Sequence, residues 1–293
     1  MSTLTTLTAA GRKDRSRRSR ASLAWHVAAL AVLMVVLYPV VWLIGGSFKP
    51  SEDIIGSLDL LPTDPIASNY TGLKEGIADI SIATFFTNSL VLAVGSVIGV
   101  LISSSLTAYA FARIRFAGRN VLFTLMIGTL LLPYHVLLIP QYVIFQKLGW
   151  VDTLTPLLIG KYLAVDAFFV FLMVQFIRSL PKELDEAARI DGCGHGRIFL
   201  SIVLPLCRPA LITSAIFTFI NAWNDFMGPL IYLNTPENYT VSMGLKMFVD
   251  QEGLANYGGM IAMSMVALLP VLAFFLVFQR YLIDGMATSG LKG

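Results

Sequence analysis

The residues of this chain that are best suited to recognition chemistry lie in one polar stretch, residues 177–209, between two long apolar runs. This stretch is polar and helix-prone, and it carries a carboxylate, Glu186, beside two small residues, Ala187 and Ala188. Leu184, Ala187 and Ala188 are spaced at i, i+3 and i+4, so we expect them on one narrow apolar face. The candidate docking residues are Glu186, Ala187, Ala188, Asp191, Gly192, Ile202 and Pro205.

Two short helices have to position these residues. We expect Ser179 to cap the first helix, with Pro181 in its first turn, where a missing N–H costs nothing. Acidic residues at its start suit the helix dipole, and Gly192 supplies the left-handed position that ends it. A second helix is predicted over about residues 196–204, where Pro205 stops it. The pattern predicts a helix–Gly–helix elbow against the membrane face, suited to docking.

The chain as a whole has the composition of a membrane protein. Of its 293 residues, 56% are hydrophobic and only 13% are charged, whereas soluble domains have about a quarter charged residues. Its mean hydropathy is +0.74. Six apolar runs are long enough to cross a hydrocarbon core of about 30 Å. We therefore predict an all-α membrane protein with six transmembrane helices, at residues 24–46, 85–112, 120–145, 154–176, 210–233 and 258–279.

These spans define a transmembrane domain over residues 23–279, with the polar elbow as its loop. Residues 1–22 are rich in Ser, Thr and Arg and are predicted to form a disordered basic tail. No clean cleavage site follows the first apolar run, so we interpret it as a signal anchor. Residues 280–293 are predicted to form a cytoplasmic C-terminal tail.

The distribution of positive charge predicts the orientation. With the N-terminus inside, the inner segments hold 16 of the 21 Lys and Arg residues. The other five lie outside or near the outer membrane face, and they are Lys49, Lys74, Lys147, Lys161 and Lys246. Cytoplasmic loops carry an excess of positive residues. Both termini and the elbow are therefore predicted to be cytoplasmic.

The spacing within the elbow also carries a resemblance. Glu-Ala-Ala, three residues, Gly, nine residues and Ile-x-Leu-Pro is similar to the EAA motif of ABC importer permease subunits, and every fixed position is filled. Further motifs, from about Trp25 to the end, resemble the carbohydrate-uptake branch and the smaller second permease of maltose-type importers. They are Ser47-Phe48-Lys49-Pro50, Asn69-Tyr70, Asn88-Ser89, Ala108-Tyr109-Ala110-Phe111-Ala112-Arg113, Leu132-Pro133 with Ile139-Pro140, Trp223-Asn224-Asp225 and Gly290-Leu291-Lys292-Gly293.

This resemblance implies a permease of the bacterial inner membrane that forms half of a pore for a sugar or oligosaccharide. The implied partners are a second permease subunit, an ATPase dimer, an extracytoplasmic sugar-binding protein and membrane lipid, with no nucleic acid. The ATPase would bind ATP and Mg, and this chain would hold no cofactor. By resemblance, Glu186 would meet a basic residue of the ATPase, and Ala187 and Ala188 would fit its cleft. Gly192 would permit the bend of this coupling loop.

The sequence offers no evident catalytic or metal site of its own. The only Gly-Lys pair, Gly160-Lys161, lacks the rest of a phosphate-binding loop, so we expect a partner to hydrolyse ATP. Cys193, His195 and Cys207 are close in sequence, but two or three such groups on a mobile loop make a poor zinc site. We interpret these three residues as structural.

Polar residues in the fifth span are candidates for a substrate pathway, because polar groups are costly in lipid. Asn221, Asn224 and Asp225 are spaced at i, i+3 and i+4, which predicts one polar stripe on a helix. Trp223 is adjacent, and an aromatic ring beside amides and a carboxylate suits the binding of sugar rings. Alternatively, the stripe seals the chain against the partner permease through interhelical hydrogen bonds.

Two other features of the spans concern packing. Gly95-x-x-x-Gly99 in the second span permits the close approach of another helix. Asp166 is a lone acid in the fourth span, and Lys161 lies about 140° away around a continuous helix. We therefore expect no good ion pair between them.

Other functions remain open at this point. An ABC permease for a non-sugar solute is the nearest alternative. An ATP-independent secondary transporter predicts internal repeats or coupled ion sites, which we do not find in the sequence. A membrane-embedded enzyme would need convergent catalytic groups, and three scattered histidines, His26, His135 and His195, do not provide them.

Overall fold

The structure, a computed structural model, describes the backbone of residues 4–56, 59–250 and 256–290 and the side chains of residues 22–56, 59–133, 136–249 and 256–280. Within these ranges the chain is almost entirely helical, and its only β-type pairing is one bridge between Ile77 and Ile80. The elements in order are α1 (Leu4–Gly46), α2 (Ser51–Ile54), α3 (Ser68–Gly72), α4 (Ile82–Arg113), α5 (Arg119–Thr129), α6 (Tyr134–Lys147), α7 (Thr155–Tyr162), α8 (Ala167–Ser179), α9 (Glu183–Ile190), α10 (His195–Ile198), the π-helix η1 (Phe199–Val203), α11 (Leu204–Leu206), α12 (Arg208–Asn224), α13 (Met227–Tyr232), the 3₁₀-helix η2 (Pro236–Asn238), α14 (Val241–Asp250) and α15 (Tyr257–Gly290).

Among the described residues, four helical segments are long and apolar enough to cross a membrane. They are Ser22–Gly46, Ile82–Arg113, Thr155–Ser179 and Tyr257–Arg280. Each overlaps one of the predicted spans. The bent pair His195–Leu206 and Arg208–Asn224, whose axes meet at 74°, gives a fifth if it is counted as one span.

The remaining predicted span, residues 120–145, is divided into α5 and α6. The break lies around Leu130–Pro133, and Pro133 precedes the first residue of α6. Proline cannot donate the backbone hydrogen bond that a continuous helix needs at this position. The predicted spans are therefore not six continuous helices in this structure. The number of membrane crossings stays a prediction.

The N-terminal basic segment also differs from expectation. Helix α1 begins at Leu4, so it includes most of the residues that we predicted to be a disordered tail. Arg and Lys have good helix propensity, and a helix that already exists extends at little cost because only its nucleation is unfavourable.

The chain divides into two compact units. The first contains the residues up to Tyr70 together with Tyr257–Met265, and the second contains Thr71–Asn256 and the residues from Val266 onward. In the first unit, two of the sequence motifs meet. The side-chain amide of Asn69 donates hydrogen bonds to the carbonyl oxygens of Ser47 (3.0 Å) and Lys49 (2.8 Å). Tyr70 donates to the Ser47 hydroxyl at 2.8 Å, so these motifs hold the end of α1 against α3.

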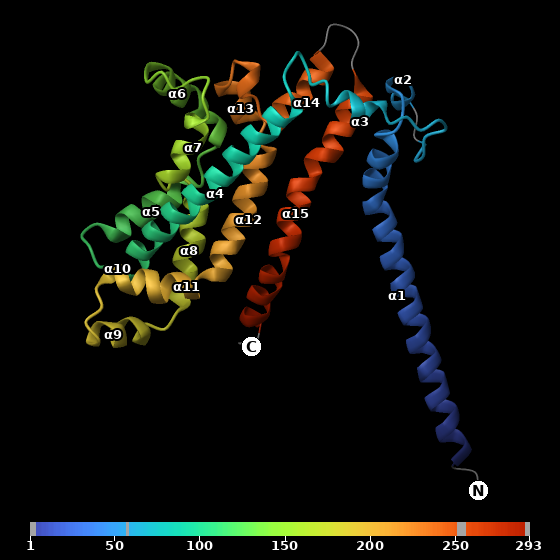
Figure 1. The fold of residues 1–293 in the computed structure, drawn as a ribbon. Coiled ribbons are helices and arrows are strands. Elements are labelled where there is room, and N and C mark those ends of the chain that lie inside the picture. Colours follow the sequence, from blue (N-terminus) through green and yellow to red (C-terminus); the bar gives the residue numbers. More distant parts are fainter. Residues whose placement is uncertain (1–3, 57–58, 251–255, 291–293) are drawn as a thin grey trace. The chain divides into compact units, whose positions relative to one another are not determined.

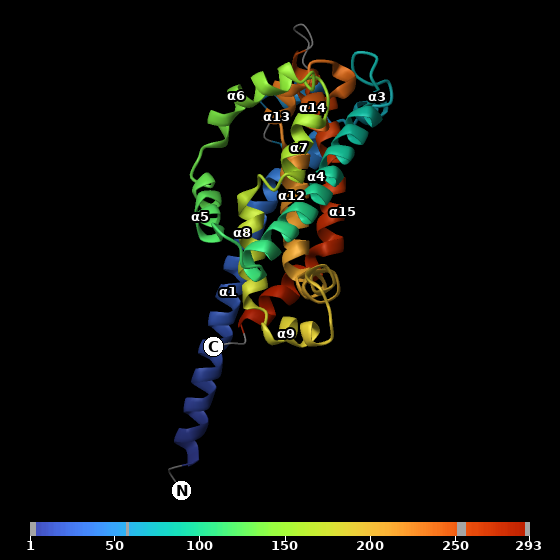
Figure 2. The same cartoon turned by 90° about the vertical axis from the view of Figure 1, so that its left-hand side faces the viewer.

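Helix α4 organises the second unit. It packs against α7, α8 and α12, and these helices run side by side in both views (Figures 1 and 2). Gly95 and Gly99 allow the approach of α7, because a Cβ at Gly99 would lie 2.8 Å from the ring of Tyr162 and one at Gly95 would lie 3.0 Å from Leu158. The prediction that this glycine pair serves close helix packing is confirmed.

The short helices of the second unit gather at its two ends. Helices α13 and α14 lie at one end, and α9 and α10 lie at the other (Figures 1 and 2). A buried apolar cluster fills the end near α9 and draws on six helical elements, α4, α8, α9, α10, η1 and α12. Its buried members are Ala108, Tyr109, Phe111, Val170, Met173, Val174, Ile177, Ala188, Ile198, Phe199, Val203, Cys207 and Ala210.

At the opposite end, Asp152 joins two loops. Its carboxylate accepts hydrogen bonds from the backbone N–H groups of Asn234 and Thr235, each at 2.8 Å, and from the Thr235 hydroxyl. The hydroxyl hydrogen bond is the main reason why the pKa of Asp152 is lowered from 3.8 to about 2. Since a lowered pKa favours the folded state at higher pH, this link is fully present above 3.8 and is lost as the pH falls through about 2.

Candidate functional site

Helix α9 carries the candidate docking residues, and its first turn is acidic. Glu183, Asp185 and Glu186 lie in that turn, where carboxylates interact favourably with the helix dipole. The predicted cap is wrong, because no side chain caps this helix and Ser179 belongs to α8. The Ser179 hydroxyl donates to the carbonyl oxygen of Phe176 at 2.7 Å, inside its own helix. The extended backbone at Leu180 separates the two helices.

The faces of α9 differ from the predicted pattern. Ala188, which is 6% exposed, packs into the buried cluster. Asp185, three residues earlier and therefore on the same face of the helix, is buried as well. Glu186 and Ala187 are exposed, as are Leu184 and Ile190, which is 87% exposed. The expectation that Ala187 and Ala188 share one face is therefore wrong. Ala188 anchors the helix to the chain, and Ala187 with Glu186 and Ile190 faces outward.

Gly192 ends the helix in the predicted way. Its φ is +80°, a left-handed conformation that side chains with a Cβ adopt poorly. The N–H of Cys193 then donates to the carbonyl oxygen of Ala188 at 2.9 Å, and that of Gly192 donates to Arg189 at 3.0 Å. These bonds satisfy carbonyl groups that the end of a helix leaves free. Asp191 precedes this turn and is exposed.

The second arm of the elbow continues further than predicted. It begins with α10, widens into the π-helix η1 and ends with α11, which contains Pro205. The N–H of Leu204 donates to the carbonyl oxygen of Phe199, five residues back, which is the π-helical pattern. The prediction that Pro205 stops the helix is wrong, since the bend lies at Cys207. Ile202 packs against the buried cluster, and Pro205 is exposed.

An ion pair that the sequence analysis missed fixes α9 to α4. Arg113, the last residue of α4, lies 2.8 Å from Asp185 (Nε to Oδ2), and the two side chains are 3% and 8% exposed. Arg113 also donates to the carbonyl oxygen of Leu180 at 2.9 Å. A second contact joins Tyr109 and His195, whose hydroxyl and Nδ1 are 3.2 Å apart. Arg113 is a cation at the end of an apolar span, and the acids of α9 follow another span, so these two charged ends were the only signal for such a pair.

A charged cavity of about 830 Å³ lies beside this ion pair. Besides Ala112, Ile114 and His195, its lining is charged, with cationic groups in excess. The charged residues are Arg113, Arg115, Arg119, Arg178, Lys182, Asp185, Glu186 and Arg189. Because Asp185 is paired with Arg113, Glu186 is the remaining acid beside five other cationic side chains.

Both cysteines are free thiols. Cys207 is buried in the apolar cluster, and burial raises the pKa of its thiol to about 11. Cys193 is half-buried and packs against the same cluster. Among the described residues, no group of three His, Cys, Asp or Glu side chains could hold a metal ion.

The candidate pathway residues do not form the predicted stripe on one helix. Helix α12 ends at Asn224, and Asp225 lies in extended backbone. The Asp225 carboxylate accepts a hydrogen bond from the N–H of Gly228 at 3.1 Å, and its carbonyl oxygen accepts one from Ser242 at 2.7 Å. Asn221 and Asn224 are exposed on α12. The exposed polar surface is thus the amide pair, and Asp225 supports the turn into α13.

Trp223 packs inside the second unit. It is 4% exposed, its indole N–H donates to the carbonyl oxygen of Ala267 at 3.2 Å, and it stacks on Phe219 with a centroid distance of 5.9 Å. The Trp223 ring is therefore not available to a sugar beside the amides, contrary to expectation. A buried tryptophan with its N–H satisfied is a packing residue.

Lys161 and Asp166 form the ion pair that we did not expect. Nζ and Oδ2 are 2.9 Å apart, and both side chains are 31% exposed. The prediction assumed one continuous helix, whereas α7 ends at Tyr162 and α8 begins at Ala167. The intervening turn brings Asp166 back toward Lys161.

These features define a helical membrane protein whose exposed elbow is fixed to the bundle by a buried ion pair. Its sequence matches, over residues 95–288, the family described as binding-protein-dependent transport system inner membrane component. The chain belongs to this family, and so to the permease components of ABC importers.

Named relatives of this chain transport sugars. It is 35% identical to the arabinooligosaccharides transport system permease protein AraQ of Bacillus subtilis, over 89% of this chain and 92% of that protein. It is 30% identical to the trehalose/maltose transport system permease protein MalG of Thermococcus litoralis, over 91% of this chain and 95% of that protein. The crystal structure of a bacterial ABC transporter involved in the import of alginate shares the fold, with a TM-score of 0.77 and 24% identity, covering 90% of this chain and 98% of that chain.

Proposed function

We propose that this chain is the smaller of two permeases in an importer for a sugar or oligosaccharide, powered by a separate ATPase. An extracytoplasmic binding protein delivers the substrate, and the ATPase binds the ATP and Mg. The names of the relatives support the substrate class, since several of them transport oligosaccharides or disaccharides. A solved relative of the same fold is described in complex with a periplasmic protein, which supports the binding-protein partner.

The observation that carries the proposal is the division of α9 into two faces. Asp185 and Ala188 hold the helix to the bundle, whereas Glu186, Ala187 and Ile190 are exposed. Leu184, Ala187 and Ile190 are exposed at a spacing of three residues, and a continuous exposed apolar surface favours a partner that covers it. The ATPase docks on this outward face, Glu186 pairs with one of its cationic groups, and Gly192 with Asp191 shapes the turn behind it.

The elbow transmits the movement of the ATPase through its second arm. Ile202 packs on the apolar cluster, and Pro205 lies in α11, the last helix before the bend at Cys207 that leads into α12. Force on α9 therefore reaches α4 through Arg113 and α12 through the second arm. The six crossings, the cytoplasmic termini, the elbow over residues 177–209 and a C-terminal tail over residues 280–293 belong to this same proposal.

The exposed amides of Asn221 and Asn224 line the substrate pathway in this proposal. Trp223 and Asp225 then do not contact the substrate. They hold α12 and the turn that follows it in place, and so position the amides. An amide pair offers donors and acceptors at once, as sugar hydroxyl groups require. Should the pair instead seal the contact with the second permease, its substitution will release that subunit on purification.

The direct experiment is to express a tagged form of this chain in its own host and to purify it in mild detergent together with the proteins that stay bound to it. We expect an ATPase and a second permease to remain bound, and ATP hydrolysis to rise when a sugar-loaded binding protein is added. Mass spectrometry of the binding protein's cargo identifies the substrate. A tagged chain that moves solute in vesicles without ATP or an ATPase would contradict the proposal, and a non-sugar cargo would contradict the substrate class.

A further inference from the structure

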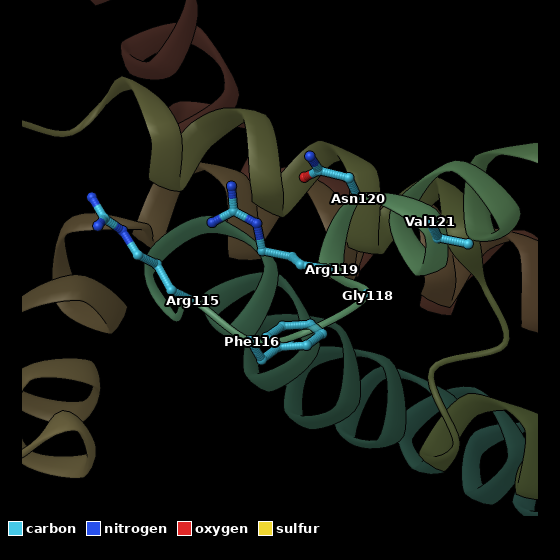
Figure 3. A pocket seen from close by; sticks show the side chains of 6 residues that line it. All are labelled: Arg115, Phe116, Gly118, Arg119, Asn120 and Val121. Carbon is cyan, nitrogen blue, oxygen red and sulfur yellow. The ribbon is translucent and has the colours of Figure 1, made fainter.

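The turn between α4 and α5 carries a basic cavity of about 410 Å³ that the docking of an ATPase on α9 does not explain. Its lining residues are Arg115, Phe116, Gly118, Arg119, Asn120 and Val121. Figure 3 shows the side chains of Arg115, Arg119 and Asn120 projecting to the same side of this turn. Two guanidinium groups and an amide thus line one cavity.

Both arginines have side-chain N–H groups that are available to a ligand. Arg119 makes one long hydrogen bond, 3.4 Å to the carbonyl oxygen of Ile114. Within the part of the chain that the structure describes, Arg115 shows no hydrogen bond or ion pair, and it is exposed. Each guanidinium carries five N–H donors in a planar fork that fits the oxygens of a phosphate group. The nearby acid Asp185 does not neutralise them, because it is paired with Arg113.

Further positive charge surrounds this cavity. Arg115 and Arg119 also line the larger charged cavity, together with Arg178, Lys182 and Arg189. Arg178 lies over the ring of Phe123 on α5, 4.9 Å from its centroid, which holds a third guanidinium near α5. Glu186 is the one unpaired carboxylate among the residues that line the larger cavity. The local field therefore favours an anion.

An exposed apolar surface begins directly beside the arginines. Val121 is 63% exposed and Leu125 is 62% exposed, and Leu122 and Phe116 are exposed as well. A phosphate ion in water would gain nothing from these side chains. A phospholipid would place its headgroup on the arginines and its acyl chains along α5, so that both parts of the surface are covered.

We propose that Arg115 and Arg119, with Asn120, bind the headgroup of an anionic phospholipid, and that Phe116 and the exposed face of α5 hold its acyl chains. The proposal rests on the orientation in the proposed function, in which Arg115 and Arg119 are among the 16 inner Lys and Arg residues and the α4–α5 turn is cytoplasmic. Basic groups at that level lie within the negative surface potential of the inner leaflet. Arg113 is the last residue of the apolar helix α4, and Arg115 and Arg119 follow two and six residues later. Their long side chains can therefore reach the depth at which lipid headgroups lie.

Native mass spectrometry of the complex that copurifies with the tagged chain tests the site. The probes are phosphatidylglycerol, which is anionic, and phosphatidylcholine, which carries no net charge. We expect retention of phosphatidylglycerol over phosphatidylcholine. The affinity for phosphatidylglycerol should fall about twenty-fivefold in Arg115→Gln/Arg119→Gln, since each such arginine contributes roughly 1 kcal/mol, or about fivefold. The matched control is Arg208→Gln, an exposed arginine on the same predicted side that lines neither cavity.

Each other result counts against the site. Equal retention of both lipids by the wild-type complex, or normal retention by the double variant, would overturn it. Displacement of phosphatidylglycerol by inorganic phosphate would show a soluble-anion site, which contradicts the lipid assignment. If the double variant loses the ATPase but keeps the lipid, the arginines contact the ATPase and the proposal is wrong. The lipid measurement does not need transport, so it remains readable even if the proposed importer function fails.

Discussion

Arg113 and Asp185 are the residues on which the position of the docking helix depends most. Their side chains are almost fully buried, and Arg113 in addition holds the carbonyl oxygen of Leu180. Removing one partner of a buried ion pair leaves the other charge without compensation, at a cost of about 3–5 kcal/mol. Replacing both partners by apolar residues of similar volume costs much less. This asymmetry provides a test at the scale of single residues.

We predict that Asp185→Ala loosens α9, whereas Arg113→Met/Asp185→Leu largely restores it. The readout is the reaction rate of the buried Cys207 thiol with a maleimide, in a Cys193→Ser background, because Cys207 shares the apolar cluster with Ala188. We expect Asp185→Ala to raise the rate by tenfold or more. If its rate equals that of the parent, the ion pair does not hold the elbow. Glu183→Ala, which removes an exposed acid from the same helix, serves as the control.

At the scale of elements, the elbow depends on a turn that needs a left-handed residue. Gly192 has a φ of +80°, and no atom lies within 4 Å of a Cβ built on it. The constraint at this position is therefore conformational and not steric. Asparagine adopts the left-handed conformation far more readily than a β-branched residue does.

We predict that Gly192→Val impairs substrate-stimulated ATP hydrolysis severely, while Gly192→Asn retains most of it. The two side chains are similar in size, so their difference isolates the backbone requirement. Membrane abundance of both variants is measured alongside hydrolysis. Equal activity of the two at equal abundance would show that the turn does not need this conformation.

The elements also show what the sequence could and could not reveal. The turn at Gly192 and the packing of Gly95 and Gly99 were predictable, because each depends on a local property of glycine. Which side of α9 faces the bundle was not, since an 8-residue helix with two apolar faces fits either way until Arg113 fixes it. The breaks at Asp166 and Pro133 were hidden inside apolar runs, where hydropathy continues although the helix does not.

The same limit applies to the candidate pathway. Asn221, Trp223 and Asn224 were correctly placed on one helix, but their surroundings depend on distant segments. Trp223 is buried because its indole reaches Ala267, and Asp225 leaves the helix because it binds Gly228 and Ser242. Spacing along a chain predicts which residues share a face. It does not predict which face another segment covers.

At the scale of the whole molecule, the chain is a permease component of an ABC importer. Its family, its nearly all-helical structure and the covered lengths of its relatives agree on this. In the function proposed above, the ATPase acts on the elbow, where Glu186 is exposed and Asp185 is buried. That function requires the outward face of α9 to bind the ATPase.

Retention of the ATPase by Glu186→Lys tests this claim most directly. Charge reversal replaces an attraction with a repulsion worth several kcal/mol at an interface, so we predict at least a hundredfold loss of ATPase affinity, given about tenfold for each 1.4 kcal/mol. Glu237→Lys, an exposed reversal at the opposite end of the second unit, is the matched control and retains the ATPase. Normal retention and hydrolysis in Glu186→Lys, at normal membrane abundance, would show that the outward face of α9 does not bind the ATPase.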